Sequence, residues 1–266
     1  MKSAITLSLV SDLRGGPWIF WDDLGESFRR AKDLGYDGVE LFTVEPDAPG
    51  LEDAISATGL ELAAVGTGAG KVMHGLYLTS PDADVRTKAI AFIKEMIDWG
   101  ARFNAPAILG SMQGNDKSVP KDQAIAWLGE ALEQLGDYAG EKGVKFIYEP
   151  LNRYETVLFN RVGPAAEFVA GLKTDGIVLL ADLFHMNIEE ENLADAIRAG
   201  GKHIGHVHLA DSNRRPGGMG HTDFAPIGAA LKEIGFSDFV SAEALCYPDD
   251  TTAAQATIDC YNKHFA

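Results

Sequence analysis

The chain has 266 residues, of which 46% are hydrophobic, and it carries a formal net charge of -16. This acidity argues against a polyanionic partner, because proteins that bind nucleic acids draw most of their affinity from Lys and Arg side chains that neutralise phosphates. A small, largely neutral substrate suits the charge better.

No apolar run reaches the roughly 18 residues that a membrane-spanning helix requires. Met1-Lys-Ser-Ala leads directly into a strand pattern rather than a signal peptide. Two cysteines, Cys246 and Cys260, lack any CxxC pairing and are expected to be reduced thiols. We therefore expect a cytoplasmic protein without a membrane partner.

The first third of the chain alternates strand-like and helix-like segments. Strands are predicted over residues 4–10, 38–42 and 60–65, and helices over about Asp22 to Leu34 and residues 51–57. Glu40 lies inside the second strand, where we expect a buried, hydrogen-bonded acid that supports a nearby site. The loop 66–76 carries Lys71 and His74, which either reach over a pocket or are solvated.

The alternation continues to the end of the chain. Ser80 is predicted to cap a helix with Pro81 at its first position. Further helices are expected at 121–139, 164–172, 192–199 and 251–261, and further strands at 106–110, 145–149, 177–182, 203–208 and 239–243. Eight strands alternating with eight helices predict a single-domain (β/α)8 TIM barrel over residues 1–266. The competing fold is an open doubly wound sheet. The sequence argues against it, because no GxGxxG follows the first predicted strand and no GxxxxGK[ST] occurs.

Four predicted strands end in residues that can bind a metal ion: Glu149, Asp182, His208 and Glu243, separated by 33 (182 − 149), 26 (208 − 182) and 35 (243 − 208) residues. In a barrel the carboxyl ends of the strands meet at one mouth. Three carboxylates and one imidazole suit Mn²⁺, Mg²⁺ or Co²⁺ better than a thiolate-seeking metal. His206 shares a strand face with His208 and is expected to support the site or to fill the layer below.

Three further polar residues follow these strands in the sequence: Glu155, His185 and Arg214. Each is predicted to lie on a loop that leaves a strand with a candidate ligand. There it can hydrogen-bond the hydroxyl or carbonyl groups of a bound polyol.

Several of these segments resemble a known family. They are Glu-Pro-Leu-Asn-Arg-Tyr-Glu-Thr from Glu149, Asp-Leu-Phe-His-Met from Asp182, His-Val-His-Leu-Ala-Asp-Ser-Asn-Arg from His206, and Pro-Gly-Gly-Met-Gly from Pro216. The sequence is similar to the xylose isomerase-like TIM barrel superfamily, in the sugar isomerase/epimerase branch that includes the D-tagatose and D-psicose 3-epimerases.

This resemblance implies one bound divalent metal ion, commonly Mn²⁺, held by Glu149, Asp182, His208 and Glu243. Glu149 and Glu243 would also form the acid/base pair. Glu155, His185 and Arg214 would hold the O1 and O2 end of a ketose. A homodimer or homotetramer is expected on the same ground.

The chemistry expected from such a site is removal and return of the proton next to a carbonyl group, through an enediolate that the metal stabilises. Two bases on opposite faces suit epimerisation, whereas one base would give aldose-ketose isomerisation. Residues 16–20 and 111–114 differ from the aromatic-lined segments of the ketose 3-epimerases, so a lyase or deglycosidase that acts on a keto-sugar or keto-glycoside stays open.

An inosose isomerase or a sugar-phosphate isomerase also stays open, and the loop arginines at 153, 161, 214 and 215 could bind a phosphate group. A DNA-repair endonuclease would need a basic face and a His-rich zinc site, whereas this chain is acidic with seven histidines. A sugar sensor without catalysis would leave the acid/base pair without a role.

Overall fold

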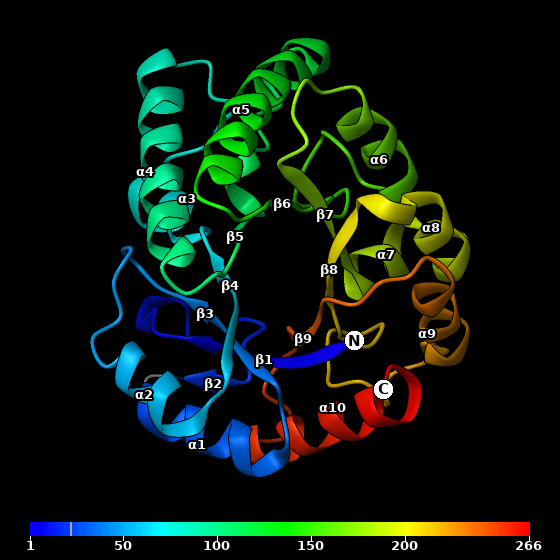
Figure 1. Ribbon diagram of the computed structural model, residues 1–266. Helices are drawn as coiled ribbons and strands as arrows, with labels where there is room; N and C mark the ends of the chain where they lie inside the picture. Colours follow the sequence, from blue (N-terminus) through cyan, green and yellow to red (C-terminus); the bar gives the residue numbers. More distant parts are fainter. Residues whose placement is uncertain (22) are drawn as a thin grey trace.

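The computed structural model describes residues 1–21 and 23–266, so the predicted helix start at Asp22 lies outside the described residues. The strands of this part form one parallel sheet in the order β2-β1-β3-β4-β5-β6-β7-β8-β9. Because β1 also pairs with β9, eight of these strands close into a ring, and β2 pairs with the last two residues of β1, beyond the part that pairs with β9. Figure 1 shows the ring with helices around it. The predicted TIM barrel is confirmed.

The strands are short and lie close to their predicted positions. They are β1 (Lys2–Ser8), β2 (Phe20–Trp21), β3 (Gly38–Phe42), β4 (Glu61–Gly66), β5 (Ala107–Leu109), β6 (Phe146–Tyr148), β7 (Ile177–Asp182), β8 (Ile204–His208) and β9 (Phe239–Ala242). The two-residue strand β2 was not predicted, because so short a segment carries no readable alternation of apolar and polar residues.

The helices alternate with the strands. They are α1 (Leu24–Leu34), α2 (Leu51–Thr58), α3 (Ala69–His74), α4 (Ala83–Ala101), α5 (Lys121–Glu141), α6 (Val162–Ala170), α7 (Leu183–Glu189), α8 (Leu193–Gly200), α9 (Phe224–Glu233) and α10 (Asp250–His264), with 3-10 turns at Ser11–Leu13, Ser111–Gln113 and Gly201–His203. Where a helix was predicted, its described ends fall within three residues of the expected ones.

Three local predictions were wrong. Residues 69–74, expected in a loop, form α3, which ends at Gly75 with φ 67°. Residues 183–189, also expected in a loop, form α7, because the Asp182 side chain caps it by accepting hydrogen bonds from two backbone N–H groups. Ser80 does not cap α4. The cap is Asp82, whose side chain accepts from Asp84 N, while Ser80 Oγ accepts from Asp82 N.

The apolar core has two layers, as the barrel architecture requires. Most buried apolar side chains lie between the ring of strands and the surrounding helices. A smaller cluster of Ala64, Ile108, Ile147 and Leu180 fills the ring itself. Strand register places Glu40 beside Ala64 and His206 beside Leu180, so two polar side chains share this inner layer. Within this layer, β4 to β7 therefore contribute apolar side chains, and β3 and β8 contribute the polar ones.

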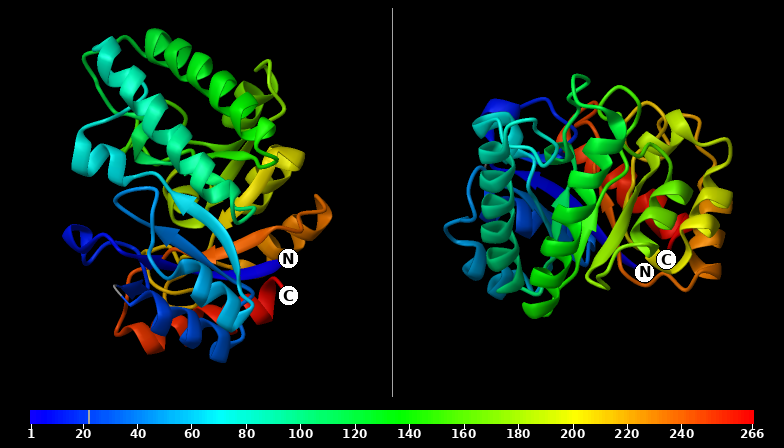
Figure 2. Two further views of the ribbon diagram at one scale, coloured as in Figure 1. Left: turned by 60° about the vertical axis from the view of Figure 1, so that its left-hand side comes forward. Right: turned by 90° about the horizontal axis from the view of Figure 1, so that it is seen from above.

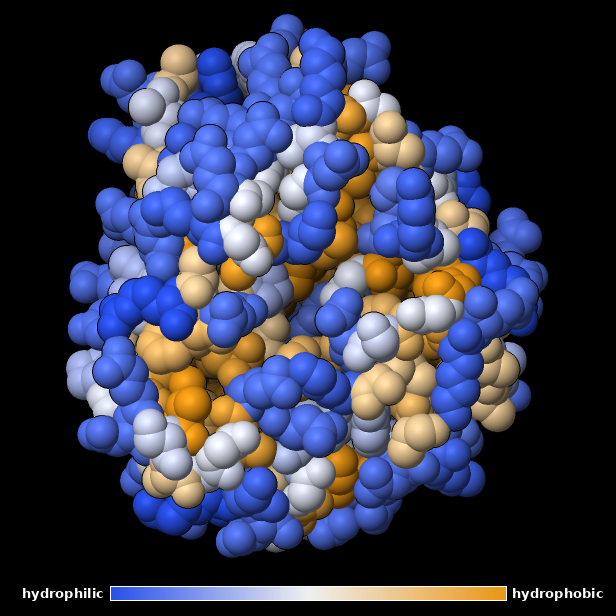
Figure 3. Space-filling model, viewed as in Figure 1, coloured by the Kyte–Doolittle hydropathy of each residue, from blue (hydrophilic) through white to orange (hydrophobic). Residues whose placement is uncertain are grey.

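The chain termini lie close together on one side of the barrel (Figures 1 and 2), where Tyr261 Oη donates to Met1 O at 2.6 Å. Seen from this side, the surface is mostly hydrophilic, with apolar side chains around a central hollow (Figure 3). A cavity of about 420 Å³ lies among the amino ends of the strands, lined by Lys2, Glu61 and Phe239 among others. No helix in the described ranges is long and apolar enough to cross a membrane.

Close packing at Gly176, just before β7, gives a testable prediction. A Cβ atom at this position would overlap the carbonyl group of Gly136 in α5. We expect Gly176→Ala to lower the free energy of unfolding by about 1–3 kcal/mol, since the backbones must separate. Gly140→Ala is the matched control. A Cβ atom at this position meets nothing within 4 Å, and the substitution removes a flexible residue from a helix. Urea denaturation of both variants measures the difference, and equal stability would contradict the proposed close approach.

Candidate metal centre

The four predicted metal ligands come together at the carboxyl ends of four neighbouring strands. Glu149 follows β6, Asp182 ends β7, His208 ends β8 and Glu243 follows β9. One oxygen or nitrogen atom from each residue lies within 4.8 Å of those of the other three, and all four residues are buried. Residues more than 90 positions apart in the sequence thus become neighbours, because a parallel barrel brings the strand ends to one mouth.

Two atoms of this cluster have no hydrogen-bond partner although they are buried: Asp182 Oδ2 and His208 Nδ1. They lie 3.5 Å apart, and His208 Nδ1 lies 3.3 Å from Glu243 Oε2 and 3.9 Å from Glu149 Oε1. Buried polar atoms are nearly always satisfied by a partner. Unsatisfied oxygen and nitrogen atoms that converge in this way fit a divalent cation.

The charges in the cluster also fit a cation. Burial raises the pKa of Glu149 well above its ordinary value, and the neighbouring Glu243 and Asp182 carboxylates add to this shift. The pKa of Asp182 is lowered despite burial, because His185 and Arg214 favour its ionised form. The pKa of His208 is raised despite burial, mainly by Glu40 and Glu243. A bound cation would replace protons that the cluster otherwise holds.

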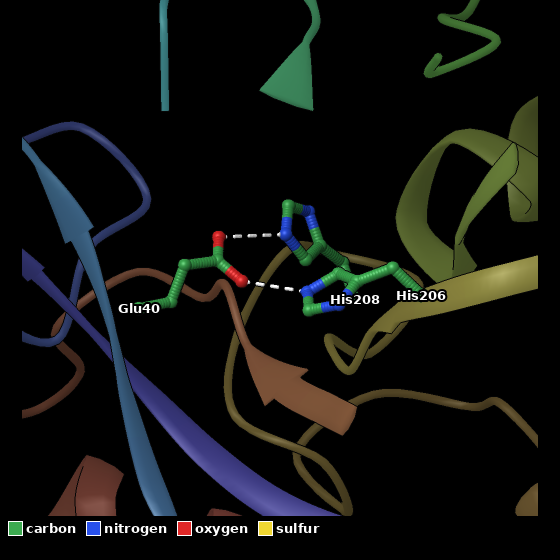
Figure 4. Close-up of side chains that lie close together, drawn as sticks. All are labelled: Glu40, His206 and His208. Atoms are coloured by element: carbon green, nitrogen blue, oxygen red, sulfur yellow. Dashed lines mark hydrogen bonds and ion pairs between the residues drawn. The ribbon is translucent and has the colours of Figure 1, made fainter. Parts of the chain in front are cut away.

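A buried hydrogen-bond network fixes His208 in place (Figure 4). Glu40 is fully buried in β3, and its two carboxylate oxygens lie 2.7 Å from His206 Nε2 and 2.9 Å from His208 Nε2. The two histidines hold the pKa of Glu40 well below its usual range even though burial opposes this. An ionised Glu40 accepts a hydrogen bond from His208 Nε2–H, which leaves Nδ1 as the ring atom that faces the three carboxylates. The predicted burial of Glu40 and the shared face of the histidines are confirmed.

His185 and Glu155 are linked by Asn152, a residue to which the sequence analysis assigned no role. Asn152 is buried, and its Nδ2 lies 2.8 Å from both Glu155 Oε1 and His185 Nδ1. His185 Nε2 lies 3.6 Å from Glu149 Oε1 and from Asp182 Oδ2, and burial lowers the pKa of His185. His185 lies on α7 rather than on the predicted loop. Asn152 occurs three residues after Glu149, in the segment between the two candidate site acids Glu149 and Glu155.

Arg214 extends from the long connection after β8. Its guanidinium pairs with Glu243, lies 3.6 Å from Asp182 Oδ2 and stacks 4.6 Å over the ring of Phe184. The backbone at Arg214 is left-handed, with φ 59°. Asp211 holds this turn, because its carboxylate accepts hydrogen bonds from backbone N–H groups at 212, 218 and 222. Arg214 therefore faces the cluster with a fixed orientation.

A cavity of about 440 Å³ opens over this cluster and is lined by Glu149, Glu155, His185, His208, Arg214 and Glu243 among others. Two further residues contact Glu149, and the sequence analysis assigned a role to neither: Gly110, which lines the cavity, and Gln113, which is buried and does not line it. A Cβ atom on Gly110 would lie 2.6 Å from Glu149 Oε2, so glycine leaves room for that carboxylate. Gln113 Nε2 donates to Glu149 O at 2.9 Å.

Lys71, His74 and the two cysteines are not part of the cluster of candidate ligands. Lys71 lies on α3, and partial burial lowers its pKa although Glu155 opposes the shift. His74 at the end of α3 is exposed. Cys246 is exposed and Cys260 is buried, and both are free thiols, as expected.

A divalent cation should stabilise the folded chain if it binds here. At a Mn²⁺ concentration 100 times the dissociation constant, the expected gain is about 2.7 kcal/mol. At roughly 2–4 °C per kcal/mol for a protein near this size, the melting temperature should rise by about 5–10 °C. Asp182→Asn keeps an oxygen that can cap α7 but loses the charge, so it should lose most of this shift in a thermal melt. An equal shift in both proteins would place the cation elsewhere.

The same stabilisation should depend on pH. Because the folded chain raises the pKa of His208 and Glu149, a cation must displace their protons. Cation affinity should therefore rise with pH, by up to about tenfold per unit for each displaced proton while that group is protonated. Calorimetric titrations with Mn²⁺ at pH 6 and pH 8 measure the effect, and affinity that does not change with pH would count against these ligands.

Comparisons with known proteins agree with this geometry. The family model described as "Xylose isomerase-like TIM barrel" matches residues 28–264. The D-psicose 3-epimerase of Agrobacterium fabrum is 32% identical over 213 residues, which cover 78% of this chain and 70% of that protein. The 3-dehydro-D-guloside 4-epimerase of Escherichia coli is 28% identical over 248 residues, which cover 88% and 92%.

A solved structure has the same fold. The D-psicose 3-epimerase of Clostridium cellulolyticum H10 with D-tagatose superimposes with a TM-score of 0.83 and 23% identity, over 100% of this chain and 99% of that one. The relatives named here are sugar epimerases, which are isomerases. The resemblance inferred from the sequence is confirmed, and the chain belongs to the xylose isomerase-like TIM barrel family.

Proposed function

We propose that this chain is a divalent-metal-dependent sugar epimerase of the ketose 3-epimerase type. One observation carries the proposal: the carboxylates of Glu149 and Glu243 lie 3.9 Å and 3.3 Å from His208 Nδ1, and they follow strands that are separated by β7 and β8. Two carboxylates that approach one bound substrate from different sides are the arrangement that inversion of a carbon centre requires.

Each residue has a distinct part in this reaction. One of Glu149 and Glu243 removes the proton next to the ketone, and the other supplies a proton to the opposite face. A cation held by Glu149, Asp182, His208 and Glu243 would supply Lewis-acid charge that stabilises negative charge on the substrate oxygens.

The remaining residues position the sugar. His185, Glu155 and Arg214 would hold the O1 and O2 end of the ketose by hydrogen bonds. Asn152 orients His185 and Glu155 with its 2.8 Å contacts to both. The guanidinium of Arg214 stays charged and donates to oxygens without moving a proton.

We propose Mn²⁺ as the cation, with Mg²⁺ or Co²⁺ as substitutes, because three of the four ligands are carboxylates. A single domain over residues 1–266 is supported by the pairing of β1 with β9, which closes the ring with the first and last strands. The net charge of -16 supports a small sugar rather than nucleic acid as the partner. A homodimer or homotetramer remains part of the proposal.

A second candidate is epimerisation at C4 of a 3-keto-glycoside. It is favoured by the Escherichia coli relative, a 3-dehydro-D-guloside 4-epimerase that aligns over 92% of its length. The chemistry is the same, because C4 is also next to the ketone. An eliminating enzyme would share the first proton transfer but would release a fragment.

The test is proton exchange in D₂O followed by NMR, with Mn²⁺-loaded protein and a panel of ketoses and keto-glycosides. The proposal expects deuterium at the carbon next to the ketone together with a new epimer. The labelled carbon distinguishes C3 from C4 chemistry, a released fragment identifies elimination, and an aldose product identifies isomerisation. Absence of exchange and of released fragments across the panel would overturn the proposal.

A further inference from the structure

The cavity over the candidate metal centre has two unlike halves. Its charged residues come from β6 to β9 and the connections that follow them. On the other side of the ring, the segments after β1 and β4 and the last residue of β3 contribute apolar side chains: Val10, Leu13, Pro17, Trp18, Phe42 and Val72. We call these six residues the apolar wall. Because both halves line one cavity, a single small molecule can contact both.

Few groups near the apolar wall can bind the hydroxyl groups of a sugar. Thr43 and Thr67 line the cavity there, but Thr43 Oγ1 donates to Glu45 O and Thr67 Oγ1 donates to Ile108 O, each at 2.6 Å. Their only hydroxyl hydrogens are therefore engaged within the protein. The two threonine oxygens can still accept hydrogen bonds, and Ser111 also lines the cavity. The six side chains of the wall offer a sugar hydroxyl group no acceptor, and their one polar atom is the buried donor Trp18 Nε1.

The aromatic part of the wall is held in a defined arrangement. The ring centroids of Trp18 and Phe42 lie 5.0 Å apart, and Trp21 packs edge-on against Trp18 at 5.6 Å. Trp21 Nε1 donates to Trp18 O at 2.9 Å, which fixes the segment. Gly66 has no side chain, and a Cβ there would overlap the Phe42 ring. The wall is thus a fixed aromatic surface, of the kind that stacks with planar apolar groups.

The wall also continues out to the rim of the cavity. Val72 is 55% exposed although it lines the cavity, and its neighbour Met73 is 38% exposed. These are among the large apolar side chains that are exposed in the described part of the chain. An apolar group of the ligand that extends out of the cavity would cover them.

We propose that the substrate is a keto-glycoside with an apolar, ring-containing aglycone. The keto-sugar ring lies against the carboxylates at the ends of β6 to β9, and the aglycone lies on the apolar wall. This inference rests on the second candidate under the proposed function, epimerisation of a 3-keto-glycoside, for the position of the sugar ring. It adds the chemical class of the group at the anomeric carbon, which the proton-transfer chemistry alone leaves undefined.

The experiment compares three probes on Mn²⁺-loaded protein: the methyl and phenyl glycosides of one 3-ketohexopyranose, and a pair of free 2-hexuloses that are epimers at C3. Calorimetry gives affinity, and deuterium uptake gives kcat/KM. We expect the phenyl glycoside to bind and react about tenfold or more better than the methyl glycoside. Equal affinity of the two glycosides, or a higher kcat/KM for the free ketose, would overturn the inference.

Variants assign the preference to the wall. Trp18→Ala should lower phenyl glycoside affinity by about tenfold and methyl glycoside affinity by less than about twofold. Trp127→Ala is the control, since Trp127 lies on α5, packs under Arg86 of α4 and does not line the cavity. Val72→Ser, at an exposed position that tolerates change, should reduce the preference by about threefold. A preference that survives both Trp18→Ala and Val72→Ser would overturn the inference.

The two readouts separate this inference from the proposed function. Tighter binding of the phenyl glycoside without deuterium uptake from any probe would support the wall and refute the epimerase. Deuterium uptake without a preference between the glycosides would support the epimerase and refute the wall.

Discussion

Glu243→Gln is expected to lower the rate of epimerisation by about 10²–10⁴-fold, the usual contribution of a general acid or base. The amide keeps an oxygen that can still bind the cation, but it cannot exchange a proton. Glu149→Gln should have a similar effect for the same reason. Both residues are only 6% exposed, so neither substitution changes the surface of the protein appreciably. The measurement is conversion of one epimer into the other in D₂O, followed by NMR.

The two variants should differ in which epimer they deuterate. Suppose that each glutamate acts on one face of the substrate carbon. A variant that lacks one glutamate can then still remove the proton from the epimer whose hydrogen faces the remaining glutamate. Each variant should then exchange the label in one epimer only, without converting it, and the preferred epimer should be opposite in the two variants. Glu61→Gln, at a 57% exposed side chain beside Lys2 near the start of β4, is the control and should keep full activity.

If both variants lost exchange in both epimers, one glutamate would be the single base and the other would be required only as a ligand. An aldose-ketose isomerase with one base would then explain the site better. Full activity in either variant would remove that glutamate from the acid/base pair.

The sequence predicted the barrel well because its signals are local and repeated. Gly35 ends α1 in the left-handed conformation, with φ 85°, as glycine after a helix commonly does. Glu149 precedes Pro150, which stops the ladder of β6 and marks the start of a loop. Repetition of such signals over the chain indicates eight units, and the barrel then determines which strand ends meet.

The sequence could not predict contacts that depend on the closed ring. Glu40 and His208 are separated by 168 positions, and only the closed ring brings them into hydrogen-bond contact. Arg214 belongs to a connection whose shape depends on three backbone bonds to Asp211, and no pattern in the sequence indicates that it reaches Asp182. The α7 helix was missed because seven residues are too few to show a helical period.

Glu40→Gln is expected to weaken Mn²⁺ binding by about 10–100-fold, although Glu40 is not a candidate ligand. In the native chain one carboxylate accepts a hydrogen bond from each of two histidines, at 2.7 Å and 2.9 Å. The amide offers one acceptor and one donor group, so one histidine must change its tautomer. Where that histidine is His208, Nδ1 becomes protonated and can no longer bind the cation. Electron paramagnetic resonance titration of Mn²⁺ measures the dissociation constant directly.

A matched variant separates orientation of the ligand from general loss of stability. His206→Gln keeps an amide donor for Glu40 and leaves the bond between Glu40 and His208 in place, so Mn²⁺ affinity should change by less than about threefold. Both variants disturb the same buried network, and each should lower the free energy of unfolding by about 1–3 kcal/mol. Equal stability loss with unequal Mn²⁺ affinity would assign to Glu40 the orientation of His208. If Glu40→Gln bound Mn²⁺ as tightly as the wild type, the carboxylate would serve the fold alone, and His208 would be held by the packing of β8.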